Sequence, residues 1–398
     1  MTSELTITME SVTPLFLGGA NPRGAPELRP PSFRGAMRYW LRAALGGVCG
    51  DDEAGLSVAR EAEARVFGST DEQCGGASSI TLRVKGDLSK PEEYQRAPAV
   101  CVEKNGERLR QPTGRDYLYW SMPGFGGEPN RKYYPAGYKF SLNLSVRPGV
   151  IDGRAVFQQA IGALWLLVQL GGIGSRSRRT AGSLSVVEPL AVEGLSFALH
   201  SSDSSGIVQE LKEGLNNVRR LFQEHISPRR LAQPAEFDVL HSGVCKVWVL
   251  GIWPSSQQAV EAIGAAMRDF RTYREPDHSQ VAKWLSGTTI PTVERAVFGL
   301  PLPFRYSNNG PKGVVQGRTK PKEQAIDRRA SPLWLKISKT QTGAFVGIAT
   351  LFKSRFLPEG EKLHEQNEKG LPLPLPSSYA LIEQFIKEGF SAQEVTFD

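Results

Sequence analysis

Cysteine and histidine are scarce in this chain, which has four cysteines and five histidines in 398 residues. The cysteines stand at positions 49, 74, 101 and 245, form no CxxC pair, and have no histidine at zinc-finger spacing. That pattern argues against a disulfide framework and against a structural zinc site. We therefore expect a reduced, cytoplasmic protein that needs no metal or other cofactor.

Long hydrophobic runs are also lacking. The most apolar stretch, residues 160–170, is far shorter than a membrane span and contains Gln169. The first ten residues have neither a basic cluster nor an apolar run, so we expect no secretion signal and no membrane contact. The length instead suggests two globular domains, which we place at residues 1–193 and 194–398.

Positive charge is in excess, and most of it is arginine. The chain has 31 arginines and 17 lysines against 41 acidic residues, a net charge of +7. Arginine offers a planar fork of donors that fits a phosphate and a flat cation that stacks on bases. A codon bias toward arginine would give the same composition. The positions of the arginines therefore have to decide between such a bias and a role in nucleic-acid binding.

The first half of the chain alternates strand and helix patterns. Strands are predicted at 4–12, 79–86, 138–146 and 184–192, and helices at 33–47 and 152–170. The order β-α-β-β-α-β is that of ferredoxin-like folds, including RNA-recognition motifs, which bind RNA on the open face of the sheet. Residues 87–137 show no clear period and are expected to be loop-rich.

The second half is expected to repeat this order. Strand and helix patterns appear at 195–200, 206–225, 244–253, 256–273, 332–338, 344–351 and 378–390. The repeat rests on element order, because the two halves share little sequence. We predict an α+β protein of two tandem ferredoxin-like (RRM-like) domains with long inserted loops.

An arginine stripe marks the helix at 33–47. Arg34, Arg38 and Arg42 recur every fourth residue and share one face, where they repel one another unless an anion neutralises them. Tyr39 and Trp40 flank the stripe as candidate base-stacking surfaces. The alternative is a solvated basic face with Trp40 in the core.

Two basic loops are further candidates. The loop at 171–183 holds three arginines, hydroxyl side chains and no acid, and its glycines allow a phosphate to approach the backbone. Its candidate RNA-binding residues are Gly172, Gly174, Ser175, Arg176, Arg178, Arg179 and Gly182. Residues 304–329 carry seven basic and two acidic residues and are expected to be a loop that becomes ordered on a polyanion; from it we select Arg328 and Arg329. Both loops have a plain alternative, a solvated connection.

Signals for catalysis are few. The sequence has no HExxH or GxSxG motif, and no histidine accompanies a nucleophile motif. His278, near Asp277 and Lys283, is the one histidine for which an acid–base role can be drawn.

Four segments together resemble a known family. Residues 13–43 (TPLFLGGANPRGAPELRPPSFRGAMRYWLRA) resemble the N-terminal signature of the first-numbered RAMP-superfamily subunits of type III-B CRISPR effector complexes. Residues 171–184 resemble the glycine-rich loop of the superfamily, and residues 297–304 and 327–337 resemble its C-terminal segments. The resemblance implies two ferredoxin-like domains and a non-catalytic place at the head of a ribonucleoprotein, beside other RAMP subunits. It also implies contact with the 3′ part of the guide RNA, with the paired target RNA, or with both.

Two alternatives stay open. A metal-independent endoribonuclease of the CRISPR RNA-processing class would share the fold, but the glycine-rich loop of that class lies near the C-terminus rather than in mid-chain. A protein-interaction scaffold would use the same basic loops to meet acidic neighbours.

Overall fold

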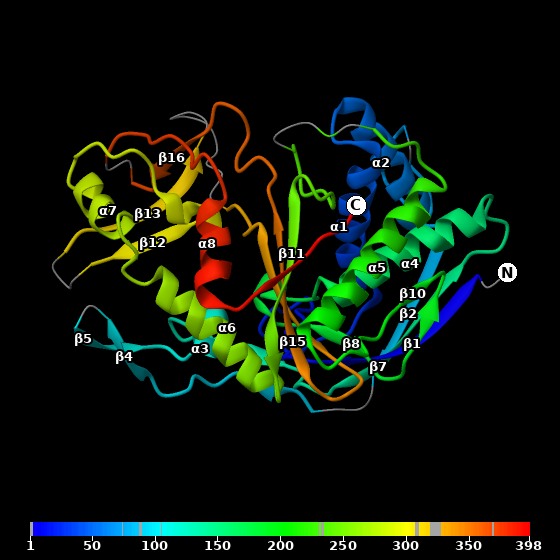
Figure 1. Cartoon of the computed structure of the whole chain (residues 1–398), viewed down its shortest axis with the longest axis horizontal. Helices are drawn as coiled ribbons and strands as arrows, with labels where there is room; N and C mark the ends of the chain where they lie inside the picture. Colours follow the sequence, from blue (N-terminus) through cyan, green and yellow to red (C-terminus); the bar gives the residue numbers. More distant parts are fainter. Residues whose placement is uncertain are drawn as a thin grey trace.

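The computed structural model describes residues 3–73, 75–86, 90–104, 106–229, 231, 235–306, 310–318, 328–367 and 370–398 (Figure 1). Its first sheet contains four antiparallel strands, in the order β2 (Ile80–Gly86), β7 (Lys139–Val146), β1 (Glu4–Ser11) and β8 (Leu184–Val186). The helices of this half are α1 (Pro30–Cys49), α2 (Glu53–Phe67) and α4 (Gly153–Gln169). The order predicted for the first half is confirmed, and α2 lies where the polar segment 50–64 was also expected to be helical.

Local sequence explains these elements. In β1, Leu5, Ile7 and Met9 alternate with polar residues and are buried on one face. Two prolines occupy the first positions of α1, where the missing N–H has no helical partner to lose. Asp152 stands at the N-cap of α4, but its side chain makes no capping hydrogen bond.

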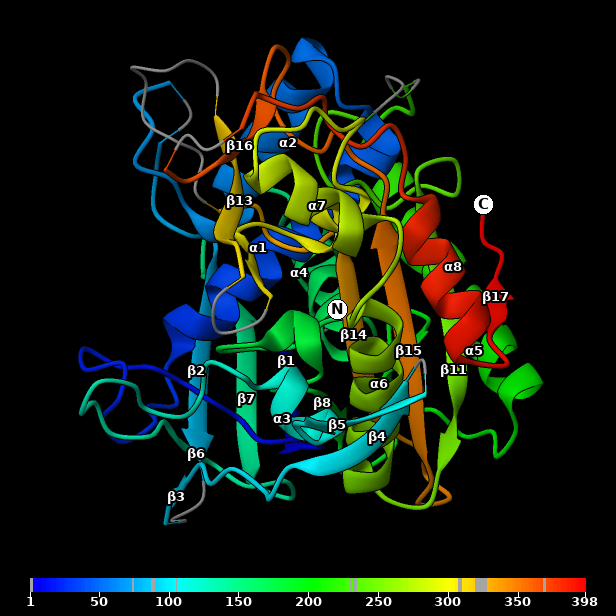
Figure 2. The same cartoon turned by 90° about the vertical axis from the view of Figure 1, so that its left-hand side faces the viewer.

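The segment predicted as loop-rich, 87–137, contains short elements between β2 and β7. They are β3 (Glu92–Glu93), β4 (Val100–Lys104), β5 (Glu107–Gln111), α3 (Gly114–Leu118) and β6 (Lys132–Tyr133). Helix α3 does not pack on the first sheet; it packs on α6 (Ser256–Arg271) of the second half, as both views show (Figures 1 and 2). The insertion therefore joins the two halves.

The second sheet repeats the strand order of the first. Its antiparallel strands are, in order, β14 (Leu333–Lys339), β15 (Phe345–Phe352), β11 (Cys245–Trp253) and β17 (Gln393–Val395). Helix α6 follows β11, and α8 (Ala380–Gly389) precedes β17. The predicted strands and helices from residue 244 onward are confirmed at these places.

The start of the repeat differs from the prediction. The segment 195–200 was expected to be the first strand of the second sheet, but β10 (Leu195–Ser196) pairs with β9 (Ala191–Val192) in a hairpin. Both residues of its turn, Glu193 and Gly194, have positive φ, as a two-residue hairpin turn requires. The expected boundary between 193 and 194 falls in this turn, and β11 is the first strand of the second sheet. Helix α5 (Ser204–Gln223), expected in the second domain, packs against α1 and α4 of the first half as well as against β11 and β17.

A smaller lobe is formed by two insertions, one between α6 and β14 and one between β15 and α8. It contains α7 (Asp277–Leu285), a 3₁₀ turn η2 (Glu294–Phe298), β12 (Leu302–Arg305), β13 (Lys312–Arg318) and β16 (Lys362–Glu365) around its own apolar core. The prediction that 304–329 is entirely a loop is wrong for β13, which pairs with both β12 and β16. The glycine-rich composition of β13 favours a loop, but backbone hydrogen bonds to a strand on each side hold this segment in the sheet. Residues 307–309 and 319–327 lie outside the described ranges.

One lysine is buried where the two sheets meet. Lys336 of β14 is 1% exposed, and its Nζ donates a hydrogen bond to the Leu184 carbonyl of β8 at 2.8 Å. Burial lowers the pKa of this amine to about 7. A charged amine in this place therefore opposes folding at acidic pH.

Replacing Lys336 with methionine should change how stability depends on pH. Above about pH 7 the folded wild type holds a neutral Lys336 while the unfolded chain stays protonated up to its ordinary pKa, so wild-type stability rises with pH in that window. Relative to Lys336→Met, the free energy of unfolding should rise by up to about 1.4 kcal/mol per pH unit between about pH 7 and pH 9. Urea titrations of both proteins at each pH measure this, and parallel pH profiles would contradict it.

Candidate functional site

The arginine stripe of α1 is partly neutralised from within the protein. Arg42 Nη1 lies 2.9 and 3.0 Å from the carboxylate oxygens of Glu63 on α2, and Arg38 Nη1 lies 3.4 Å from the same group. Arg38 Nη2 also donates to the Phe67 carbonyl at 2.8 Å, at the C-terminal end of α2 where a cation is favourable. Arg34 is half-buried and has no hydrogen-bond or ion-pair partner among the described residues. One carboxylate, Glu63, therefore offsets part of the charge of three arginines.

Trp40 lies in the core rather than beside the stripe. Its ring is 0% exposed and packs on Trp334 and Phe352 of the second sheet, at centroid distances of 5.3 and 6.0 Å. A Cβ on Gly171 would lie 2.3 Å from Trp40 Nε1, so glycine is required beside it. In this fold Trp40 has no face on which a base can stack, which corrects the expectation for this residue. Its role is to join the two halves.

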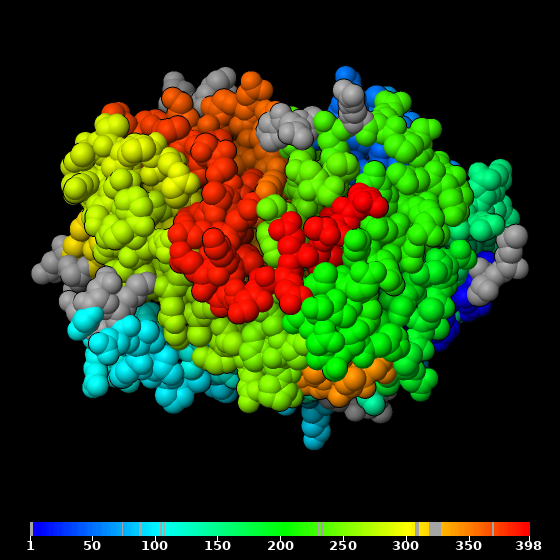
Figure 3. Space-filling view, viewed as in Figure 1, coloured from blue at the N-terminus to red at the C-terminus, as the bar shows by residue number. Residues whose placement is uncertain are grey.

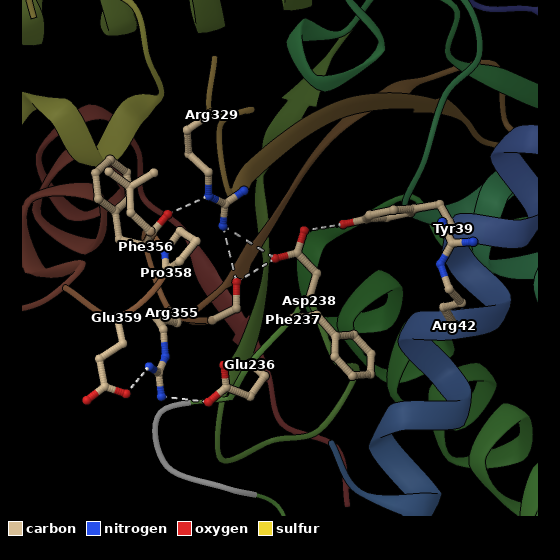
Figure 4. Close-up of a pocket in the computed structure, with 12 residues that line it drawn as sticks. Tyr39, Arg42, Glu236, Phe237, Asp238, Arg329, Arg355, Phe356, Pro358 and Glu359 are labelled. Carbon is tan, nitrogen blue, oxygen red and sulfur yellow. Dashed lines mark hydrogen bonds and ion pairs between the residues drawn. The ribbon is translucent and has the colours of Figure 1, made fainter. Parts of the chain in front are cut away.

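The three candidate segments converge on one carboxylate, Asp238. Figure 4 shows Tyr39 and Arg329 on either side of it. The Tyr39 hydroxyl donates to Asp238 Oδ2 at 2.8 Å and accepts from Trp334 Nε1 at 3.0 Å. Burial and the Asp238 charge raise the pKa of Tyr39 well above its ordinary value. Tyr39 therefore acts as a neutral donor to this carboxylate.

Two guanidiniums share Asp238 with Tyr39. Arg178 lies 3.6 Å from Oδ2, and Arg329 lies 3.9 Å from Oδ1, where Ser354 Oγ also donates at 2.7 Å. The Arg178 guanidinium covers the rings of Tyr39 and Trp334, at 5.1 and 4.5 Å from their centroids. The carboxylate borders a pocket of about 520 Å³ that Arg42, Arg329 and Arg355 also line. The sequence therefore identified Tyr39, Arg178 and Arg329, but not the acid that gathers them.

The glycine-rich loop packs tightly at the junction of the halves. Gly182 donates to the Pro14 carbonyl and Ser175 to the Phe16 carbonyl, each at 2.9 Å, and Thr180 donates to the Leu335 carbonyl at 2.8 Å. A Cβ on Gly174 would lie 2.3 Å from the Phe16 oxygen, and one on Gly182 would lie 1.9 Å from the Ile173 oxygen. A Cβ on Gly172 would lie 3.1 Å from two carbonyl oxygens of the same loop. These glycines let the loop fit against its neighbours, rather than leaving an open backbone cradle for a phosphate.

The arginines of this loop diverge from a strained turn, η1 (Ser177–Arg179). Arg176 and Thr180 on either side have φ of +64° and +70°, a left-handed conformation that is unfavourable for side chains with a Cβ. Arg178 points to Asp238, as described. Arg179 is buried and donates to the carbonyls of Leu333 and Phe298, at 3.3 and 3.2 Å. Arg176 Nε donates to the Leu118 carbonyl at 2.7 Å.

Arg176 and Arg179 belong to a cluster of positive charge that includes Arg271 at the end of α6. Burial and the charge of Arg271 lower the pKa of Arg176 to about 10 and that of Arg179 to about 9. Arg271 Nε is buried without a hydrogen-bond partner, and the Arg271 guanidinium lies over the ring of Phe298 at 5.0 Å. Within the described residues, no carboxylate pairs with any of these three arginines. The group can therefore gain free energy by accepting an anion.

The remaining predicted residues are more peripheral. Arg328 is exposed and has no hydrogen bond or ion pair with the described residues. Arg271 was missed by sequence reasoning, because a basic residue at the end of an amphipathic helix ordinarily only complements the helix dipole. Nothing in the sequence indicated Asp238 either, because its segment has no regular period.

His278 does not stand out as a catalytic base. Its ring packs between Tyr273 and Tyr306, each 4.8 Å away between centroids, and Nδ1 lies 3.7 Å from Glu275 Oε1. Burial lowers the pKa of His278. Over the described ranges, no group of three metal-ligating side chains is found. The same ranges contain no helix with the length and apolar character of a membrane span.

Comparison with known proteins gives consistent matches. A family model described as the RAMP superfamily matches residues 8–185. The chain is 28% identical over 369 residues to the CRISPR system Cmr subunit Cmr1-1 of Pyrococcus furiosus, covering 89% of each chain. It is 32% identical over 194 residues to subunit Cmr1-2 of that organism, covering 46% of this chain and 95% of the relative.

Two solved structures share the fold. The crystal structure of apo Cmr1 from Pyrococcus furiosus has a TM-score of 0.61 at 24% identity and covers 99% of both chains. A chain in a cryo-EM structure of the type III-B Cmr-beta complex, bound to cognate target RNA and AMPPnP, has a TM-score of 0.51 at 13% identity. That match covers 96% of this chain and 98% of the other.

Proposed function

Because the chain belongs to the Cmr1 family of RAMP-superfamily proteins, we propose that it is a non-catalytic, RNA-binding subunit of a type III-B CRISPR ribonucleoprotein. Its RNA would be the guide RNA, the paired target RNA or both, and its protein partners would be other RAMP subunits of the complex. Base pairing would supply sequence specificity, while the protein contacts backbone and shape. This assignment is supported by the similar fold of a chain from the Cmr-beta complex, which is bound to cognate target RNA.

We infer that the architecture behind this role is a pair of ferredoxin-like units. Each sheet has the strand order second, third, first, fourth, with all pairs antiparallel. Helices cross between the first and second strands and between the third and fourth. In this division the second unit begins at β11 rather than at residue 194.

The observation that carries the RNA-binding proposal is the cluster of Arg176, Arg179 and Arg271. Arg179 is buried and donates to two backbone carbonyls, so Arg176 and Arg271 are the members that would meet RNA. No carboxylate among the described residues pairs with any of the three, and their mutual repulsion favours binding of an external polyanion. Phosphate is the anion that the planar donor fork fits best in two-point contacts. Arg34 and Arg328 add charge that has no described partner. Arg38, Arg42 and Arg178 have internal acids and are secondary candidates.

The test is binding of a labelled single-stranded RNA, and of its DNA analogue, to the full chain by fluorescence anisotropy. We expect RNA binding that weakens steeply between about 50 and 200 mM salt, with the RNA recovered intact on a gel. No RNA binding at the lower salt would contradict the proposal. Cleavage that persists in EDTA would instead identify the chain as a metal-independent endoribonuclease.

A further inference from the structure

Two large aromatic rings are exposed on the inserted segment 87–137. The side chains of Trp120 and Phe125 are 56% and 53% exposed. Of the six other tryptophans, five are buried and Trp253 is half-buried. Large exposed aromatic surface is unfavourable in water, so two such rings on one short segment indicate a contact with another molecule.

The backbone that carries these rings is held firmly. Tyr119, next to Trp120, is 0% exposed, and its hydroxyl lies 2.9 Å from Thr180 Oγ1 in the glycine-rich loop. Leu118 and Met122 are also buried, in an apolar core that they share with residues of the second sheet and α6. Trp120 therefore points outward from a chain whose neighbouring side chains are fixed.

Helix α3 adds a second anchor just before Trp120. The Glu261 carboxylate of α6 accepts hydrogen bonds from the backbone N–H groups of Gly114 and Arg115, at 2.6 and 3.0 Å. A Cβ on Gly264 would lie 2.0 Å from the Gly114 oxygen, so the two backbones are in close contact. Figure 2 shows α3 lying against α6. In the space-filling view the neighbouring hairpin β4–β5 protrudes at the lower left edge, below the inserted lobe (Figure 3).

Guanidiniums accompany both rings. The Arg176 guanidinium lies 5.8 Å from the centroid of Trp120, and that of Arg96 lies 5.5 Å from the centroid of Phe125. Arg96 Nη2 also donates to the Trp120 carbonyl at 3.5 Å. Through Arg176 this surface is continuous with the unneutralised arginine cluster. Interleaved aromatic rings and arginines are the pattern with which proteins hold unpaired nucleotides.

We propose that Trp120 and Phe125 form a stacking platform for unpaired bases of single-stranded RNA, with Arg96 and Arg176 contacting the adjacent phosphates. The proposal rests on the RNA-binding function above and deepens it by assigning base contacts to the inserted segment. RNA is the better occupant than an apolar protein surface, because the rings are flanked by cations. Asp116, the acid of α3, is buried and held by Tyr94 and Arg115.

The test compares two RNAs of about 15 nucleotides, a uridine oligomer and its abasic ribose-phosphate counterpart. We expect the wild-type chain to bind the uridine oligomer about tenfold more tightly than the abasic one, because stacking needs bases. Trp120→Ala/Phe125→Ala should bind both oligomers with the affinity that the wild type shows for the abasic one. Ile151→Ala/Leu371→Ala, which removes exposed apolar side chains elsewhere, should behave as the wild type.

Tryptophan fluorescence gives an independent readout. Because Trp120 is the most exposed tryptophan, stacking of uridine should quench part of the emission, and Trp120→Phe should remove that quenching while retaining most of the affinity. If the platform variant still prefers the uridine oligomer, the platform is wrong but the RNA-binding function stands. If the variant keeps that preference and fails to bind partner subunits, the surface is a protein contact and the proposal is overturned. If the wild type binds neither oligomer, both proposals fail.

Discussion

Replacing Arg176 and Arg271 together with glutamine should weaken binding of single-stranded RNA about 100-fold. A hydrogen bond to a charged group contributes about 1.5–3 kcal/mol, so loss of two such contacts amounts to at least about 3 kcal/mol. Arg271 Nε is buried without a hydrogen-bond partner among the described residues, so a phosphate held by this guanidinium would supply an acceptor that the described part of the chain does not. Anisotropy titrations at fixed salt measure the effect. A loss of less than about threefold would contradict the assignment.

The Arg271→Gln change alone should separate function from stability. Removing this charge relieves its repulsion with Arg176 and Arg179, so the free energy of unfolding should not fall while RNA affinity does. Arg274→Gln is the matched control. Arg274 carries the same charge three residues on, but it lies 3.2 Å from Glu388 and is already paired. The control should leave RNA affinity unchanged, and equal losses in both variants would show that only net charge matters.

Asp238→Asn should destabilise the fold by about 3 kcal/mol. The carboxylate lies near Arg178 and Arg329 and accepts hydrogen bonds from Tyr39 and Ser354. Removing one charge from a mostly buried network leaves its partners uncompensated, which costs more than the loss of an exposed pair. Urea unfolding measures the difference.

Glu359→Gln is the matched control for Asp238→Asn. Glu359 lines the same pocket and lies 3.2 Å from Arg355, but its side chain is 90% exposed. An exposed ion pair contributes little, so this variant should lose less than about 1 kcal/mol. If the two variants are equally stable, Asp238 does not hold the junction together.

Elements with strong periodicity were predictable from the sequence. The alternation in β1 and β7 and the apolar content of α4 depend on residues close in the chain, and these elements lie where the patterns indicated. Which strands pair with each other was harder to predict from the sequence. The segment 195–200 has a strand composition, but the two-residue turn at Glu193 and Gly194 pairs its first residues with β9 rather than with the second sheet.

In the candidate site, too, features set by nearby residues were predictable and contacts between distant segments were not. Sequence spacing placed Arg38 and Arg42 on one face of α1, but their counter-ion, Glu63, comes from the next helix. Trp40 is two residues from each of these arginines, a rotation of about 200° that puts it on the opposite, buried face. Arg178 and Arg329 could be identified as candidates, yet Asp238, which gathers them, lies in a segment without a period. The exposure of the aromatic rings could not be predicted either, because nothing in the sequence Tyr119-Trp120 indicates which of the two rings is buried.

RNA binding by the arginine cluster is tested most directly by the salt dependence of RNA affinity in the wild type and in Arg176→Gln/Arg271→Gln. Each phosphate contact on a single strand contributes about 0.7 to the slope of log affinity against log salt concentration. The wild-type slope should be steeper than that of the double variant by about 1.4, and both proteins should leave the RNA intact. Equal slopes would mean that Arg176 and Arg271 do not contact phosphate, and would contradict the assignment of RNA binding to this cluster.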